Sequence, residues 1–176
     1  MLRWVGHDAV AVLDGGLAKW LAEEREVTAK VPSFPATDYV GRLRPEMNAE
    51  VDSVERRLGA ADMLLLDARA PARYLGEAEP IDPAAGHIPG ARNRFNSENV
   101  AAGGAFKSAR ELKAEFRLLL GDRDPAEVVH YCGSGVAACH NLLAMEIAGL
   151  PGSRVYAGSW SEWIADPRRP QAKARA

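Results

Sequence analysis

The chain has 176 residues, of which 47% are hydrophobic and 26% charged, and its formal net charge is -2. That balance is typical of one globular domain, or of one domain plus a further piece, and it excludes a strongly basic nucleic-acid-binding surface. No apolar run approaches the roughly 20 residues of a membrane span, and the first residues lack the apolar core of a secretory signal. We therefore expect a cytoplasmic protein without nucleic-acid or membrane partners.

The first 30 residues resemble the end of the same chain. Four residue pairs recur at an offset of 143: Gly6 and Gly149, Val12 and Val155, Gly15 and Gly158, and Trp20 and Trp163. Each set predicts the end of a helix, a strand, a glycine turn and a helix that ends in tryptophan. We interpret residues 1–30 as the C-terminal remnant of a first domain. The alternative is a chance match, because strand–glycine–helix patterns are common.

Residues 31–45 contain three prolines and no periodic apolar pattern, so we expect a linker there. A helix is predicted over residues 49–58, where apolar residues recur three and four apart, with Asn48 as its N-cap. The apolar run 63–67 is typical of a short strand buried on both faces. One helical turn is expected over residues 71–75.

Turn chemistry over residues 86–91 predicts a tight turn that leads into a short strand. The next helix is expected over residues 109–120. Ser108 and Glu111 have the spacing of a capping box at its start, and Gly121 ends it.

The last third of the chain again alternates strand and helix. Residues 128–131 predict a second buried strand, which stops at the loop 132–135. A helix over 136–148 follows, then a strand over 154–156 and a helix over 160–164. Such alternation predicts an α/β fold in which helices cover both faces of a parallel sheet.

The strongest chemical signal is Cys132, which stands between a buried strand and the start of a helix. Glycines in the loop allow several backbone N–H groups to point at one spot, and the helix start adds free N–H groups and a positive dipole end. An anionic sulfur is stabilised there, so we expect Cys132 to act as a nucleophile. The alternative is a small buried hydrophobe at a strand end. The loop and first helical turn comprise Gly133, Ser134, Gly135, Val136 and Ala137.

This loop resembles the active-site loop of two-domain rhodanese sulfurtransferases, especially those of the 3-mercaptopyruvate type. Residues 66–74, 86–93 and 156–163 are similar to three further signatures of that family, in the same order. The resemblance implies a rhodanese-like three-layer αβα fold with a central parallel sheet. We divide the chain into a first-domain remnant (1–30), a linker (31–45), a catalytic rhodanese domain (46–166) and a solvated, frayed tail (167–176).

The resemblance implies that Cys132 carries sulfur as a persulfide. A small anionic donor, thiosulfate or 3-mercaptopyruvate, would supply the sulfur, and cyanide, a thiol or a protein would accept it. The loop amides of residues 133–137 would stabilise the sulfur anion, and Ser134 would bond near the donor. Arg73 matches an arginine that binds the substrate anion in the family; the alternative is that it is a plain surface charge. Arg69 either braces the loop by a salt bridge or contacts substrate. No metal or organic cofactor is implied, because sulfur itself is the carried group.

Three departures from the family bear on this expectation. Ala137 stands where the family has threonine, and Ile81 stands where the 3-mercaptopyruvate type has a second substrate arginine. Most of a first domain is missing, including an aspartate that acts with the loop serine. A former domain interface would be exposed, which predicts either weak solubility or a homodimer. The alternative function is a persulfide carrier or binding module without its own donor pocket.

Other chemistries have weaker support. Cysteine phosphatases and arsenate reductases also place a cysteine in an anion-binding loop, but their Cys-x5-Arg pattern needs an arginine where this chain has Ala138. Two cysteines exclude a disulfide framework or a paired-cysteine metal site. We interpret Cys139 as core filler, with a resolving thiol as the alternative. His87 is expected to bond backbone groups in its turn rather than to act in catalysis.

Overall fold

Two apolar strands form the centre of the fold in the computed structural model, which describes residues 1–173. β1 (Leu64–Asp67) and β3 (Val128–Tyr131) are buried along their whole length and pair in parallel. β2 (Arg92–Asn93) lies beside β1, and β4 (Arg154–Val155) lies beside β3. The strand order is therefore β2-β1-β3-β4, and every pair is parallel. The predicted α/β fold with a central parallel sheet is confirmed.

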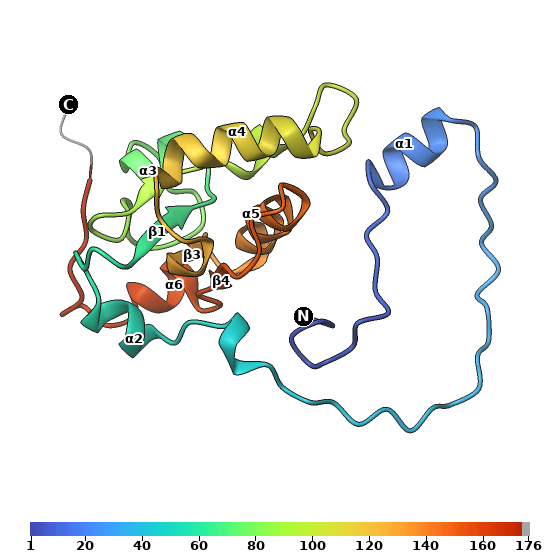
Figure 1. Ribbon diagram of the computed structural model, residues 1–176, viewed down its shortest axis with the longest axis horizontal. Helices are drawn as coiled ribbons and strands as arrows, with labels where there is room; N and C mark the ends of the chain where they lie inside the picture. Colours follow the sequence, from blue (N-terminus) through green and yellow to red (C-terminus); the bar gives the residue numbers. More distant parts are fainter. Residues whose placement is uncertain (174–176) are drawn as a thin grey trace.

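Helices cover both faces of this sheet (Figure 1). α4 (Ala109–Leu120) and α5 (Val136–Ile147) pack on one face. α2 (Val51–Arg56), α3 (Pro71–Leu75) and α6 (Ser159–Trp163) contribute to the core on the other face. None of the helices within residues 1–173 has the length and apolar character needed to cross a membrane.

The two cores follow from alternation along the strands, because successive side chains of a strand point to opposite faces. Leu66 packs with Phe116 beneath α4 and α5, whereas the neighbouring Leu65 packs with Trp160 on the other face. All four side chains are nearly or fully buried. Burial on both faces explains why the strands read as continuous apolar runs rather than alternating ones.

Helix starts illustrate where local chemistry suffices and where it does not. The capping box of α4 is confirmed: Ser108 Oγ accepts from Glu111 N at 3.3 Å, and Glu111 Oε2 accepts from Ser108 N at 3.0 Å. The predicted Asn48 cap of α2 is wrong, because Glu50 is the N-cap. Asn48 instead bridges to Val155, so this segment extends the sheet before the helix begins. Three short 3-10 helices were not predicted: η1 (Pro45–Met47), η2 (Asn96–Asn99) and η3 (Pro125–Glu127).

The N-terminal segment lies outside the sheet. α1 (Gly16–Ala22) forms as the internal repeat predicts, but residues 10–13 form no strand. A strand needs a neighbour to pair with, and none pairs with these residues within the described chain. Residues 25–44 contain no helix or strand and sweep away from the domain in Figure 1. The division into a remnant and a linker remains a prediction.

The C-terminal segment contacts the domain instead of fraying, as far as it is described. Trp163 Nε1 donates to the Pro170 carbonyl at 2.8 Å. Ala172 forms an antiparallel bridge with His87, and their backbone N–H···O distances are 2.8 and 2.9 Å. The expected frayed end is therefore wrong for residues 167–173, because buried turn and helix groups give the tail bonding partners. The final three residues lie outside the described part.

Candidate active site

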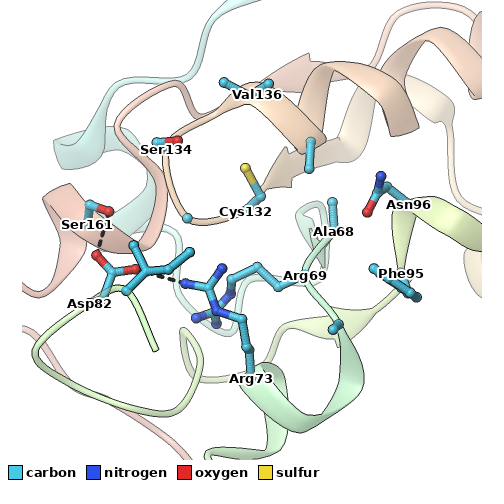
Figure 2. Close-up of a pocket in the computed structure, with 14 residues that line it drawn as sticks. Ala68, Arg69, Arg73, Asp82, Phe95, Asn96, Cys132, Ser134, Val136 and Ser161 are labelled. Atoms are coloured by element: carbon cyan, nitrogen blue, oxygen red, sulfur yellow. Dashed lines mark hydrogen bonds and ion pairs between the residues drawn. The ribbon is translucent and has the colours of Figure 1, made fainter. Parts of the chain in front are cut away.

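Cys132 is the first residue after β3, at the carboxyl edge of the sheet. Ligands bind open parallel sheets at this edge. The residue is only 3% exposed, but it contributes to the wall of a cavity of about 380 Å³. Figure 2 shows its sulfur between the start of α5 and the segments after β1 and β2. The cavity is lined by residues 68–70, 73, 81, 82, 95, 96, 132–134, 136, 137 and 161.

The loop after Cys132 requires a glycine at position 135. Gly135 has φ +80°, a left-handed conformation that L side chains rarely adopt. A Cβ atom added there would lie 2.6 Å from the Ala157 carbonyl oxygen, which is backbone and cannot rotate away. The sharp turn therefore lets α5 begin immediately beside the cysteine.

The same turn leaves a row of backbone donors free. Within residues 1–173, the amides of Gly133 to Ala137 donate to no other protein group. They lie at the N-terminus of the 12-residue helix α5, where the helix dipole is positive. Free amides and a positive dipole end together stabilise an anion near the Cys132 sulfur.

Ser159 fixes the backbone of Cys132, a contact that the sequence did not reveal. Ser159 Oγ accepts from Cys132 N at 3.1 Å and donates to the Tyr156 carbonyl at 2.8 Å. On the other side, Trp160 N donates to the Cys132 carbonyl at 3.0 Å. Ser159 is fully buried with φ +55°, an uncommon conformation for a residue other than glycine. Its tertiary bonds offset the cost of that conformation.

Arg69 is bonded on every nitrogen. Its Nε and Nη2 donate to Asp67, its Nη1 donates to Glu79 at 3.2 Å, and its Nη2 also donates to the Gly86 carbonyl at 2.6 Å. The guanidinium carbon also lies 5.0 Å from the centre of the Trp160 ring. Burial alone would lower the pKa of Arg69, but the bond with Asp67 raises it above its ordinary value. These contacts favour the bracing role over substrate contact.

Arg73 faces the loop and is 17% exposed at its side chain. Its Nε donates to Glu79 at 3.0 Å, and its Nη2 donates to Asp82 at 3.1 Å. Burial alone would raise the pKa of Glu79, but the bond with Arg73 lowers it, so this partner is ionised at neutral pH. Nη2 would lie 3.5 Å from a Cβ atom placed on Gly133, so the guanidinium is next to the residue that follows Cys132.

Asp82 and Ser161 line the cavity together with Arg73, and sequence reasoning missed both. Asp82 Oδ1 accepts from Ser161 Oγ at 2.7 Å, while Oδ2 accepts from Arg73 (Figure 2). Ile81, at the position where the family resemblance implies a second substrate arginine, is 74% exposed at the cavity rim. The one feature of the sequence that could have pointed to Asp82 is its position directly after Ile81.

The remaining loop positions line the cavity. Ser134 is exposed at its edge, and Val136 is 77% exposed beside it. Ala137 also lines the cavity without a hydroxyl. Asn96 and Phe95 come from the segment after β2 and were not predicted as cavity residues.

Cys139 and His87 are two further residues for which the sequence predicted a role. Cys139 is exposed on α5, so the core-filler interpretation is wrong. The buried side of α5 carries Ala138, Asn141 and Met145, and residue 139 points away from that side. The ring of His87 bonds the Tyr74 carbonyl at 2.7 Å through Nδ1. It therefore bonds a backbone group as expected, but the partner lies in α3 and not in the turn of His87 itself. Among residues 1–173, no three His, Cys, Asp or Glu side chains gather as they would around a metal ion.

Comparison with known proteins places these features in a family context. A family model described as "Rhodanese-like domain" matches residues 50–166. The chain is 47% identical to a probable 3-mercaptopyruvate sulfurtransferase of Pseudomonas aeruginosa over 98% of the chain and 61% of that protein. It is 35% identical to thiosulfate sulfurtransferase of Gallus gallus over 93% of the chain and 56% of that protein.

Two further comparisons concern a carrier and a fold. The chain is 33% identical to the sulfur carrier protein TtuD of Thermus thermophilus over 92% of the chain and 60% of that protein. The structure of an anaerobic ergothioneine biosynthesis enzyme from Chlorobium limicola matches with a TM-score of 0.87 and 23% identity over 99% of the chain and 44% of that enzyme. This structural likeness concerns the fold. The chain spans about 60% of the length of the curated relatives it matches.

Proposed function

The chain belongs to the rhodanese family, and from that premise we propose that it is a sulfurtransferase whose Cys132 carries the transferred sulfur as a persulfide. The observation that carries the proposal is the position of Cys132 against the free amides of residues 133–137. These donors stabilise negative charge on the attacking sulfur and on the persulfide that replaces it. The whole protein's donor and acceptor are part of the proposal.

Loading with thiosulfate would be a displacement at sulfur. The Cys132 thiolate attacks the outer sulfur, the bond between the two thiosulfate sulfurs breaks, and sulfite leaves with its electron pair. With 3-mercaptopyruvate, the carbon–sulfur bond breaks instead, and the leaving pyruvate enolate takes a proton from water. The negative charge on the new persulfide stays beside the loop amides.

Unloading would reverse the roles at the same sulfur. Cyanide, a small thiol or a protein thiol attacks the outer sulfur of the persulfide, and Cys132 returns to its thiolate form. The transferred group is sulfur, so the step uses no metal or organic cofactor. The full cycle therefore begins and ends with the Cys132 thiolate, and the persulfide is the intermediate between the two half-reactions.

Arg73 is the residue proposed to hold a donor carboxylate or sulfonate. Its Nη1 has no protein partner within residues 1–173 and lies close to Gly133. A guanidinium presents planar donors that suit such oxygen pairs. Arg69 supports the site through Asp67 and Glu79, and Ser134 contacts the donor from the rim.

The alternative is a persulfide carrier that receives sulfur from another protein. Both arginines near Cys132 are already paired with buried carboxylates, which weakens attraction for a free anionic donor. A relative, TtuD, is named a sulfur carrier protein. Under this alternative, Cys132 accepts sulfur from a persulfidated protein but reacts poorly with thiosulfate or 3-mercaptopyruvate.

Turnover separates these functions. We expect the chain to form thiocyanate from cyanide with thiosulfate or 3-mercaptopyruvate as donor. Cys132→Ser should lower the rate by about a hundredfold or more, because it removes the nucleophile. The exposed Cys139→Ser is the matched control and should keep the wild-type rate. Sulfur uptake from a persulfidated protein without turnover of small donors would favour the carrier, and no uptake from any source would contradict both.

A further inference from the structure

The cavity wall beside Cys132 presents a carboxylate and a guanidinium side by side. Asp82 Oδ2 lies 3.1 Å from Arg73 Nη2. A Cβ atom on Gly133 would lie 3.5 Å from that nitrogen and 3.8 Å from that oxygen. Both charges therefore lie against the residue next to the reactive cysteine. Figure 2 shows them on the same side of the cavity, with Asp82 bonded also to Ser161.

Asp82 is held in this position. Its side chain is 7% exposed, and its two oxygens have different partners, Arg73 and Ser161. Ser161 in turn donates its backbone N–H to the Gly133 carbonyl at 2.9 Å. Rotation of the carboxylate out of the cavity would break both hydrogen bonds, one of which is also an ion pair with Arg73. The negative charge is thus a fixed part of the wall.

The described ionic cluster carries no surplus of positive charge. Its two guanidinium groups, of Arg69 and Arg73, bond to three carboxylates, those of Asp67, Glu79 and Asp82. A doubly charged anion near Arg73 would lie within reach of the Asp82 carboxylate and would be repelled by it. Such a donor must compete with Asp82 for the same arginine.

Bonding capacity remains on both members of the pair. Arg73 Nη1 has no protein partner within residues 1–173, and each Asp82 oxygen accepts one side-chain bond, which leaves it a further lone pair. A ligand with a carboxylate and an ammonium on one carbon could bond to both at once. Its carboxylate would bond to Arg73 and its ammonium to Asp82.

We propose that Asp82 is the specificity-determining residue of this cavity, and that it selects α-amino-acid persulfides, of the cysteine persulfide class, over dianionic donors such as thiosulfate. This inference rests on the proposed function, because it assumes that Cys132 accepts sulfur. The inference specifies the class of donor by the arrangement of the donor's charged groups. Donors that carry an ammonium group beside their carboxylate gain an ion pair, whereas dianions meet repulsion at the same position.

The transfer is balanced without an added oxidant or reductant. The Cys132 thiolate attacks the outer sulfur of the donor R–S–SH, and a new sulfur–sulfur bond forms. The bond between the two donor sulfurs breaks, and its electron pair leaves with R–S⁻. The proton stays on the transferred sulfur, which gives Cys132–S–SH. The reverse step returns sulfur to an α-amino thiol through the same contacts.

The test compares loading rates of Cys132 by mass spectrometry with cysteine persulfide, prepared from cystine and sulfide, and with thiosulfate. Sulfide alone is the blank. We expect faster loading from cysteine persulfide, and Asp82→Asn should reduce the rate ratio of the two donors by about tenfold or more, as loss of one charged contact does. Asp82→Glu should retain the preference. Asp122→Asn is the control. Asp122 is exposed in the connection from α4 to β3, so it precedes the amino end of β3, whereas Cys132 follows the carboxyl end of that strand.

The outcomes separate the two levels of the proposal. Loading from both donors with an unchanged ratio in Asp82→Asn would overturn the inference and leave the proposed function intact. Absence of sulfur on Cys132 with every donor would contradict the proposed function, and the inference with it. A ratio that falls in Asp82→Asn but not in Asp122→Asn would support the inference.

A second measurement does not depend on a variant that folds. L-serine and glycerate differ by an ammonium in place of a hydroxyl, and neither transfers sulfur. We expect L-serine to protect Cys132 of the wild-type chain from iodoacetamide at about tenfold lower concentration than glycerate, because its ammonium can form an ion pair with Asp82 whereas the glycerate hydroxyl forms only a weaker hydrogen bond. Equal protection by the two ligands would overturn the inference.

Discussion

His130 and Cys132 lie two residues apart, but their surroundings differ. His130 is fully buried in β3, and neither ring nitrogen has a hydrogen-bond partner in the described chain. Burial lowers the pKa of His130 to about 3. Cys132 follows the end of the strand and contributes to an open cavity. The boundary between the packed core and the site therefore falls within three residues.

This burial predicts a pH dependence of stability. The unfolded chain protonates His130 near its ordinary pKa, about 6.5, whereas the folded chain stays neutral to about 3. Unfolding thus takes up a proton, and the free energy of unfolding falls as pH drops from about 6.5 toward 3. The slope from this residue reaches about 1.4 kcal/mol per pH unit.

His130→Leu should flatten that slope, measured by urea unfolding at several pH values between 6.5 and 4.5. Because no hydrogen bond is lost, we expect little loss of stability at pH 7.5. His7→Asn, in the N-terminal segment, is the matched control and should keep the wild-type slope. An unchanged slope in His130→Leu would contradict the attribution of this pH dependence to His130.

At the scale of elements, the turn between β3 and α5 positions the proposed nucleophile. Gly135→Ala should strain this turn and press its Cβ against the Ala157 carbonyl. We expect a loss of about 2 kcal/mol or more in the free energy of unfolding and slower sulfur loading of Cys132. Chemical denaturation and mass spectrometry measure the two effects.

Gly59→Ala is the matched control for that prediction. Gly59 has φ +76°, close to the value at Gly135, but no atom lies within 4 Å of its added Cβ. It should cost about 1 kcal/mol from backbone conformation and leave loading unchanged. Equal loading rates in the two variants would contradict a role for the turn in positioning Cys132.

Elements with strong local signals were predictable. Buried apolar runs identified β1 and β3, and the capping box identified the start of α4. Residues 10–13 had the local pattern of a strand but no partner strand to pair with. Asn48 had the composition of a cap but pairs with Val155 at the sheet edge. Tertiary pairing decided both cases, and single-sequence patterns do not contain it.

The same distinction between local sequence patterns and tertiary contacts applies to the candidate site. Cys132 and its glycine loop were visible because a strand, a loop and a helix are adjacent in sequence. Asp82, Ser159 and Ser161 come from separate segments and meet at the loop only in the folded chain. Their roles depend on contacts across tens of residues, which explains why the sequence did not reveal them. Ala172 on the turn at His87 is a further example.

At the scale of the whole molecule, the cavity is open toward an apolar rim. Ile81 and Val136 are largely exposed beside it, although most large apolar side chains of the domain are buried. The N-terminal segment contacts the domain through Asp14, whose carboxylate accepts from Phe106 N at 2.8 Å, and through Arg3, which pairs with Glu146. The homodimer expected from an exposed interface remains a prediction.

Intact-mass spectrometry of the reduced chain after exposure to a sulfane-sulfur donor, with peptide mapping, tests the central claim most directly. We predict a gain of one sulfur atom on Cys132 in the wild type and in Cys139→Ser, and no gain in Cys132→Ser. Cyanide should then remove the added sulfur and restore the starting mass. Sulfur on Cys139 alone, or no gain with thiosulfate, 3-mercaptopyruvate, cysteine persulfide and a persulfidated protein, would contradict the assignment of Cys132 as the sulfur-carrying residue.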